Sequence, residues 1–225
     1  MNGTKMGFQN QVGKYGLYIA MFGALLGGIG DVLLLYHPDG NYEAGDYLFL
    51  ADIPPHRLLI GAYLGILFIP FQVFGLAVLY QKLKPAIEGK SWLFFFAIIL
   101  TLFPGIAYHA TCAFTGMYLR IAQDLPADQS DYMFQQFDFI KLLFEPLGAF
   151  LALGFFVLSF LYSFLIWKRE TQLEKWKAWF NPALIYTFCI VVYLVFPLIG
   201  NVLAPAGFNL SLFLFFAIIA YERKK

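Results

Sequence analysis

The segment YGLYIAMFGALLGGIGDVLLLY, residues 15–36, contains a single charged residue, Asp31. A helix needs roughly 20 predominantly apolar residues to cross a hydrocarbon core of about 30 Å. The segment is also longer than the roughly 7 to 15 apolar residues of a cleaved signal peptide. It therefore predicts a first membrane-spanning helix that stays in the mature chain.

Five further apolar runs follow, separated by short polar breaks. Hydrophobic residues make up 60% of the chain and charged residues only 13%, about half the roughly 25% of a soluble domain. The runs are continuously apolar, which favours helices over the alternating strands of a membrane barrel. We predict an all-α integral membrane bundle, one transmembrane domain over residues 1–225 with helices at about 15–36, 56–80, 92–114, 139–167, 179–203 and 207–221.

Lys and Arg gather on one side of these six predicted helices. Twelve of the fifteen precede the first helix, follow the last, or lie in the loops after the second and fourth. Because positively charged loops stay in the cytoplasm, we predict a plasma-membrane protein with both termini cytoplasmic. A net charge of +1 supplies no basic face for nucleic acid. The expected partners are the lipid bilayer and a lipid or small polar ligand.

Ionisable side chains inside membrane helices are costly to bury and are therefore functional candidates. In this chain they fall in the outer halves of the predicted helices. Gly23 and Gly27 share a helix face with Asp31, and such small residues let another helix approach closely. We predict one outward-facing polar pocket, lined by Asp31, His37, His56, Arg57, His109, Glu145 and Asn201.

Three histidines with carboxylates match the donor set of a catalytic zinc site that keeps one position open. A metal-bound hydroxide attacks esters and amides, so one hypothesis is a metal-dependent lipid hydrolase. Haem is less favoured, because two of the three histidines sit at predicted helix ends and no predicted helix carries two. The hypothesis assigns metal binding to His37, His56 and His109, catalysis to Asp31 and Glu145, and substrate binding to Arg57 and Asn201.

The same residues allow other interpretations. Asp31 with Arg57, and Lys141 with Glu145, would be ion pairs that neutralise buried charge and set helix register. The protein would then be a non-catalytic scaffold or partner subunit. Alternatively, Asp31, Arg57 and Glu145 would be coupling groups of a small-solute transporter, in which three plus three helices could form an inverted repeat.

Prolines lie inside three of the predicted helices, at Pro70, Pro104 and Pro146. Each removes a backbone hydrogen bond that lipid cannot replace. We therefore expect a kink at each of the three positions.

Residues 27–34, Gly-Gly-Ile-Gly-Asp-Val-Leu-Leu, resemble the Gly-Asp helix of the lysoplasmalogenase-type membrane enzymes over less than a tenth of the chain. The three-histidine count is similar to that of the seven-helix ceramidase and adiponectin-receptor group, whose zinc site uses His and Asp. Taken as a whole, the chain looks most like the small multipass bacterial membrane families of unknown function.

Overall fold

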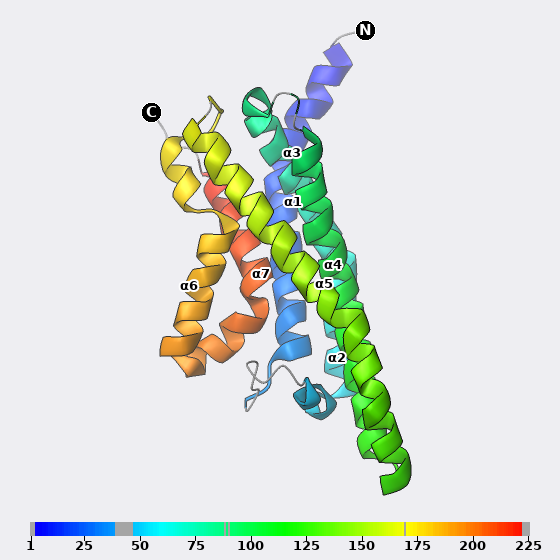
Figure 1. The fold of residues 1–225 in the computed structure, drawn as a ribbon. Helices are drawn as coiled ribbons and strands as arrows, with labels where there is room; N and C mark the ends of the chain where they lie inside the picture. The colour runs from blue at the N-terminus through cyan, green and yellow to red at the C-terminus, as the bar shows by residue number, and fades with distance from the viewer. Residues whose placement is uncertain (1–2, 39–46, 88, 90, 169, 222–225) are drawn as a thin grey trace.

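The computed structural model describes residues 3–38, 47–87, 89, 91–168 and 170–221. Within them, helices form an elongated bundle in which the start of α1 and the end of α7 lie at the same end (Figure 1). We call this the terminal end, and the opposite end the loop end. The helices are α1 (Gly3–Leu35), α2 (Pro55–Phe68), α3 (Gln72–Leu83), α4 (Ser91–Gln123), α5 (Ala127–Lys168), α6 (Pro182–Val195) and α7 (Pro197–Ala220), with short 3-10 helices at Leu48–Asp52, Ile69–Phe71, Lys84–Ala86 and Lys175–Trp179.

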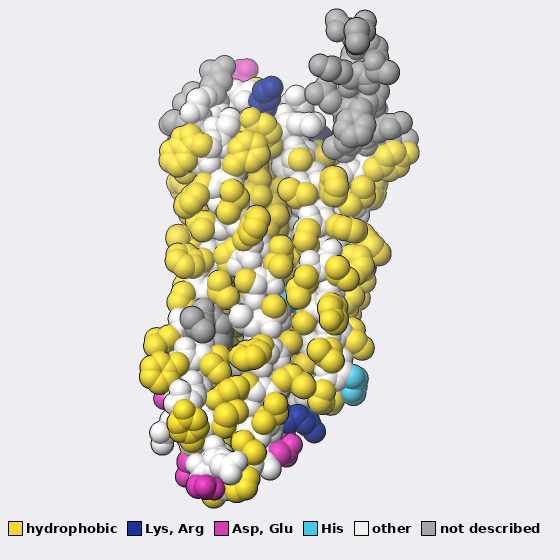
Figure 2. All heavy atoms as spheres, turned by 90° about the vertical axis from the view of Figure 1, so that its right-hand side faces the viewer, with side chains coloured by type: hydrophobic (Ala, Val, Ile, Leu, Met, Phe, Trp, Pro, Cys, Tyr) yellow, Lys and Arg dark blue, Asp and Glu magenta, His cyan; other side chains and the backbone are white. Residues whose placement is uncertain are grey.

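Long apolar helices dominate the described part of the chain. On the face shown in Figure 2, hydrophobic side chains cover the length of the bundle, and charged side chains gather toward its two ends. This distribution supports the predicted class, an all-α multipass membrane protein. Among the described residues, five segments are long and apolar enough to cross a membrane: Tyr15–Leu35, Pro55–Ala86, Ser91–Gln123, Ala127–Lys168 and Pro197–Ala220.

The predicted boundary between the last two helices is wrong. The helix predicted over 179–203 ends at Val195, and α7 begins at Pro197. Phe196 leaves the helical region, with φ −129° and ψ 73°, and proline is favoured in a first helical turn because its missing N–H would have no partner there. Pro205, near the predicted boundary, lies inside α7. As a result α6 has only 14 residues, a rise of about 21 Å.

The helices predicted at 15–36, 92–114 and 139–167 correspond to α1, α4 and α5, each longer than predicted. The helix predicted at 56–80 is divided into α2, a 3-10 turn and α3. The hairpin of α4 and α5 extends beyond the other helices at the loop end (Figure 1). Pro104 and Pro146 lie inside α4 and α5, neither of which is interrupted. Pro70 alone of the three coincides with a change of helix type, the 3-10 turn that joins α2 to α3.

Two apolar clusters fill the bundle, one above the other. The cluster of the terminal half includes Ala20, Leu76 and Phe216, and the cluster of the loop half includes Leu34 and Leu58. Along the chain, the buried Asp31 of α1 and His109 of α4 lie between residues of the two clusters, and Gln72 of α3 and Asn209 of α7 are buried polar residues as well. The candidate functional site is built from them.

A buried lysine closes the terminal end of the bundle. Lys177 is 3% exposed, and its Nζ donates to the carbonyl oxygens of Ile219 and Tyr221 where α7 ends. The last carbonyls of a helix have no intrahelical partner, and a cation beside them is favourable. Lys177 therefore ties the segment before α6 to the end of α7.

Replacing this lysine should weaken the fold. We expect Lys177→Met to lower the free energy of unfolding by about 1.5–3 kcal/mol, because hydrogen bonds to a charged group are lost. Lys168→Met, on an exposed side chain at the end of α5, should change it by less than about 0.5 kcal/mol. Detergent-solubilised protein titrated with SDS gives both values, and equal losses would contradict the role of Lys177.

Candidate functional site

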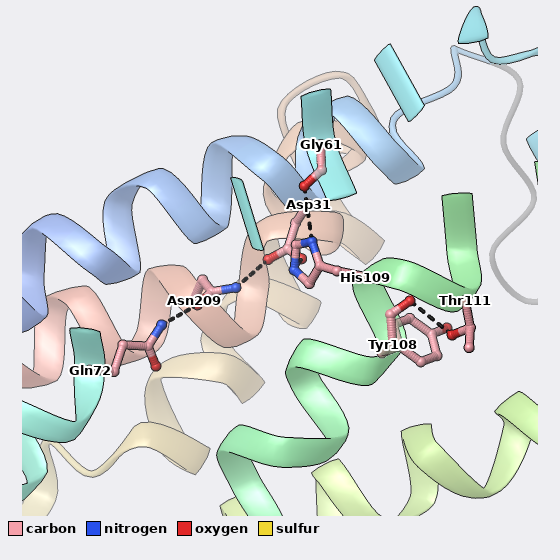
Figure 3. Close-up of polar contacts among 7 residues, drawn as sticks. All are labelled: Asp31, Gly61, Gln72, Tyr108, His109, Thr111 and Asn209. Atoms are coloured by element: carbon pink, nitrogen blue, oxygen red, sulfur yellow. Dashed lines mark hydrogen bonds and ion pairs between the residues drawn. The ribbon is translucent and has the colours of Figure 1, made fainter. Parts of the chain in front are cut away.

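Asp31 of α1 and His109 of α4 form a buried pair (Figure 3). Oδ1 of Asp31 lies 2.9 Å from Nε2 of His109, and the two residues are 9% and 3% exposed. Nδ1 of His109 lies 3.2 Å from the carbonyl oxygen of Gly61. Because that oxygen can only accept, Nδ1 carries a hydrogen. A second proton lies between Nε2 of His109 and Oδ1 of Asp31 and forms their hydrogen bond. The imidazole and the carboxylate together therefore carry no net charge.

Two amide side chains extend this pair into a row of hydrogen bonds (Figure 3). Nδ2 of Asn209 donates to Oδ2 of Asp31 at 2.8 Å, and Nε2 of Gln72 donates to Oδ1 of Asn209 at 2.6 Å. The acceptor character of Asp31 sets the orientation of both amides. The row therefore connects α1, α3, α4 and α7, and reaches α2 through the carbonyl of Gly61. We call these four side chains the polar row.

Glycines make room for the polar row. A Cβ atom on Gly65 would lie 2.0 Å from Nδ1 of His109, and one on Gly27 would lie 2.8 Å from Oδ1 of Asn209. Both distances are far below van der Waals contact. At these two positions only glycine lets the polar side chains reach the places they occupy.

One atom of the polar row has no partner. Gln72 is 1% exposed, and its Oε1 is one of two buried side-chain polar atoms without a hydrogen bond among the described residues. A buried acceptor left unpaired costs about 1–3 kcal/mol. Oε1 of Gln72 is therefore a buried acceptor that the described protein groups leave unsatisfied.

A cavity of about 450 Å³ lies beside the polar row, and all four of its residues line it. Leu194 of α6 also lines the cavity and is 62% exposed. Most of the remaining wall is apolar or aromatic and comes from α4 to α7. It includes Leu102, Leu151, Phe155, Tyr186, Ile190 and Phe208.

Only two of the seven predicted site residues, Asp31 and His109, line the cavity. Arg57 donates instead to the carbonyl oxygens of Val32 and Tyr36, at 3.1 and 2.8 Å, where α1 ends. A cation at the carboxyl end of a helix satisfies carbonyls that have no helical partner. Asp31 therefore pairs with His109 and not with Arg57.

Glu145 lies on an exposed part of α5, outside the cavity wall. Because α5 begins at Ala127 and not near residue 139, Glu145 is not close to the start of its helix. Glu145 lies about 35 Å from Lys168, the last residue of α5, measured along the helix axis at about 1.5 Å per residue. Nζ of Lys141, the predicted partner of Glu145, lies 3.9 Å from Oδ1 of Asp138. The predicted pair of Lys141 and Glu145 is not formed.

The predicted metal site is not supported. No group of three or more His, Cys, Asp and Glu side chains in the described ranges could hold a metal ion. His56 is exposed, and His37 is half-buried with its ring centroid 6.4 Å from that of Phe49. Nδ2 of Asn201 lies 3.5 Å from the carbonyl oxygen of Pro38. Both ring nitrogens of His109 face protein acceptors, so neither offers a lone pair to zinc or haem iron.

The predicted pocket left out Gln72 and Asn209, although it included another amide side chain, that of Asn201. The signal was present, since each is an amide within an apolar run, at 56–80 and 207–221. Amide side chains in membrane helices hydrogen-bond across to neighbouring helices. A search for any strongly polar side chain in these runs would have found both.

Apolar helices of membrane-spanning length, packed around an internal cavity with one polar wall, define a multipass α-helical membrane protein. Over residues 8–225 the chain matches the model of a family of unknown function, DUF6796, and it belongs to that family. No curated protein and no solved structure matches the chain. The likeness of residues 27–34 to lysoplasmalogenase-type enzymes stays a local resemblance.

Proposed function

We propose that this protein binds a small amphipathic molecule within the membrane, in the cavity beside the polar row. The observation that carries the proposal is the cavity itself, about 450 Å³ in volume and walled mostly by apolar and aromatic side chains. Ligand sites are roughly 300–1,000 Å³ and combine apolar walls with a few oriented polar groups. The apolar part of the ligand would contact the walls, and its polar group would meet the polar row.

Entry from the lipid, between α5 and α6, fits the wall of this cavity. The residues that line it include Gly148 and Leu151 of α5 and Ile190 and Leu194 of α6. Leu194 is largely exposed although it lines the cavity. An amphipathic molecule dissolved in the bilayer would therefore reach the cavity without passing through water.

Binding is favoured over lipid hydrolysis by the contacts of His109. A general base must have a ring nitrogen within reach of the substrate proton, but Nε2 faces Asp31 and Nδ1 faces Gly61. Binding is also favoured over transport, because the apolar cluster of the terminal half fills the bundle beyond the cavity. Phe94 and Phe215 in that cluster are at most 1% exposed.

We also propose the orientation that charge predicts, with both termini on the cytoplasmic side of the plasma membrane. The start of α1 and the end of α7 lie at one end of the bundle (Figure 1), as this orientation requires. The mouth of the cavity would then face the outer leaflet, since Leu194 is next to the loop-end turn between α6 and α7.

Filling the cavity tests the proposal. A Cβ on Gly148 would meet only Tyr108, at 3.7 Å, so Gly148→Leu should place its side chain in the cavity without a clash. With hexadecanol that carries a diazirine in its chain as the probe, we expect photolabelling of cavity peptides to fall about tenfold, equivalent to about 1.4 kcal/mol of binding free energy.

Gly13→Leu is the matched control, because a Cβ there has no neighbour within 4 Å among the atoms that the structure describes. It should leave photolabelling of the cavity peptides unchanged, as read by peptide mass spectrometry. Equal labelling of the two variants, or labelling confined to lipid-facing positions outside the cavity, would overturn the proposed function.

A further inference from the structure

The polar row has a direction. His109 donates from Nδ1 to the carbonyl of Gly61, and Asp31 holds the shared proton with His109 while it accepts from Asn209. Asn209 in turn accepts from Gln72. Each amide thus turns its N–H toward Asp31 and its carbonyl away from it. The last group of the row is the carbonyl oxygen Oε1 of Gln72, an acceptor.

Rotation of the amides cannot satisfy this oxygen. Turning Gln72 alone would bring its carbonyl against Oδ1 of Asn209, and two acceptors cannot hydrogen-bond. Turning Asn209 as well would place its own carbonyl against Oδ2 of Asp31. The unpaired acceptor is therefore a consequence of the carboxylate at position 31, two side chains away.

The charge of the cavity wall excludes an anionic head group. None of the described residues that line the cavity is Lys or Arg. The one carboxylate, Asp31, is matched by the proton it shares with His109, so the wall offers no charge to a cation either. A buried charge without a partner is strongly unfavourable, whereas an uncharged donor meets Oε1 of Gln72 at no such cost.

We infer that the ligand is an uncharged lipid alcohol. Its alkyl chain contacts the apolar wall, and its hydroxyl donates a hydrogen bond to Oε1 of Gln72, a buried oxygen of a cavity-lining side chain that shifts toward the cavity when the ligand binds. The inference rests on the proposed function and adds the chemical class of the ligand. An ether of the same chain offers no donor, and the corresponding acid is anionic. Gln72 is thus the residue that selects the head group.

Three photoreactive probes with one shared diazirine chain test this inference: hexadecanol, its methyl ether and hexadecanoic acid. On the unaltered protein the alcohol should label cavity peptides about tenfold more than the ether at equal concentration, and the acid should label them least. In Gln72→Met the ether should still label the cavity, but the advantage of the alcohol should disappear. Gln135→Met, on an exposed side chain of α5, should keep that advantage.

The outcomes separate the two proposals. Labelling of the cavity by none of the probes overturns the proposed function. Equal labelling by alcohol and ether leaves that function intact and overturns the inference, because Oε1 then takes a water molecule. An advantage of the alcohol that persists in folded Gln72→Met overturns the assignment to Gln72. If that variant does not fold, the comparison on the unaltered protein decides.

Discussion

Asp31→Ala and His109→Ala should each lower the free energy of unfolding by about 3–5 kcal/mol, the cost of leaving one member of a buried ion pair without its partner. Removal of the carboxylate leaves Nε2 of His109 and Nδ2 of Asn209 without their acceptor. Removal of the imidazole leaves the carboxylate in an apolar bundle. Unfolding of detergent-solubilised protein by SDS, followed by circular dichroism, measures both losses.

A double-mutant cycle identifies the partner of Asp31. Asp31→Ala with His109→Ala should cost less than the sum of the single changes, by about 0.5–3 kcal/mol, because contacting residues couple. Asp31→Ala with Arg57→Ala should be additive to within about 0.5 kcal/mol, since Arg57 binds backbone carbonyls of α1. Coupling to Arg57 and not to His109 would contradict the observed pairing.

Gly65→Ala should lower the free energy of unfolding nearly as much as loss of the pair of Asp31 and His109. Its Cβ would lie 2.0 Å from Nδ1 of His109, so the ring must move away from Gly61 and Asp31. Overpacking of a core costs about 1–3 kcal/mol, and the displaced pair adds to this. We expect a loss of about 3 kcal/mol or more in the free energy of unfolding, measured in the same SDS titration.

Two controls separate the clash from the general effect of a methyl group. Gly13→Ala, in open space on α1, should be neutral or stabilising by up to about 1 kcal/mol, since alanine is the better helix former. On the background of His109→Ala, which removes the ring, Gly65→Ala should cost little. The same loss with and without the ring would show that His109 is not what Gly65 accommodates.

The apolar runs predicted the helical class because lipid imposes one requirement on every spanning segment, a length of apolar residues. The same requirement explains where the prediction failed. Residues 115–123 and 127–138 contain charged side chains and were excluded, yet α4 and α5 continue through them. There the two helices support each other, as where the hydroxyl of Tyr118 donates to the carbonyl of Met133 at 2.9 Å. Hydropathy does not report such contacts.

The site was only half predictable for a related reason. A charge in an apolar helix shows that Asp31 needs a partner, and the predictions from the sequence are Arg57 as its ion-pair partner and His109 as a metal ligand. The choice depends on which helix faces meet, and this is decided by the room at Gly65 for the His109 ring. Single-residue patterns do not contain that information, because it belongs to two helices together.

The shortness of α6 affects the bilayer around the protein. Its 14 residues rise about 21 Å, less than the roughly 30 Å of a hydrocarbon core. Lipids beside such a helix adapt through hydrophobic mismatch, and the leaflet thins locally. Leu198, just after the α6–α7 turn, is 91% exposed. We therefore expect lipid head groups beside α6 to sit deeper than those beside the longer helices.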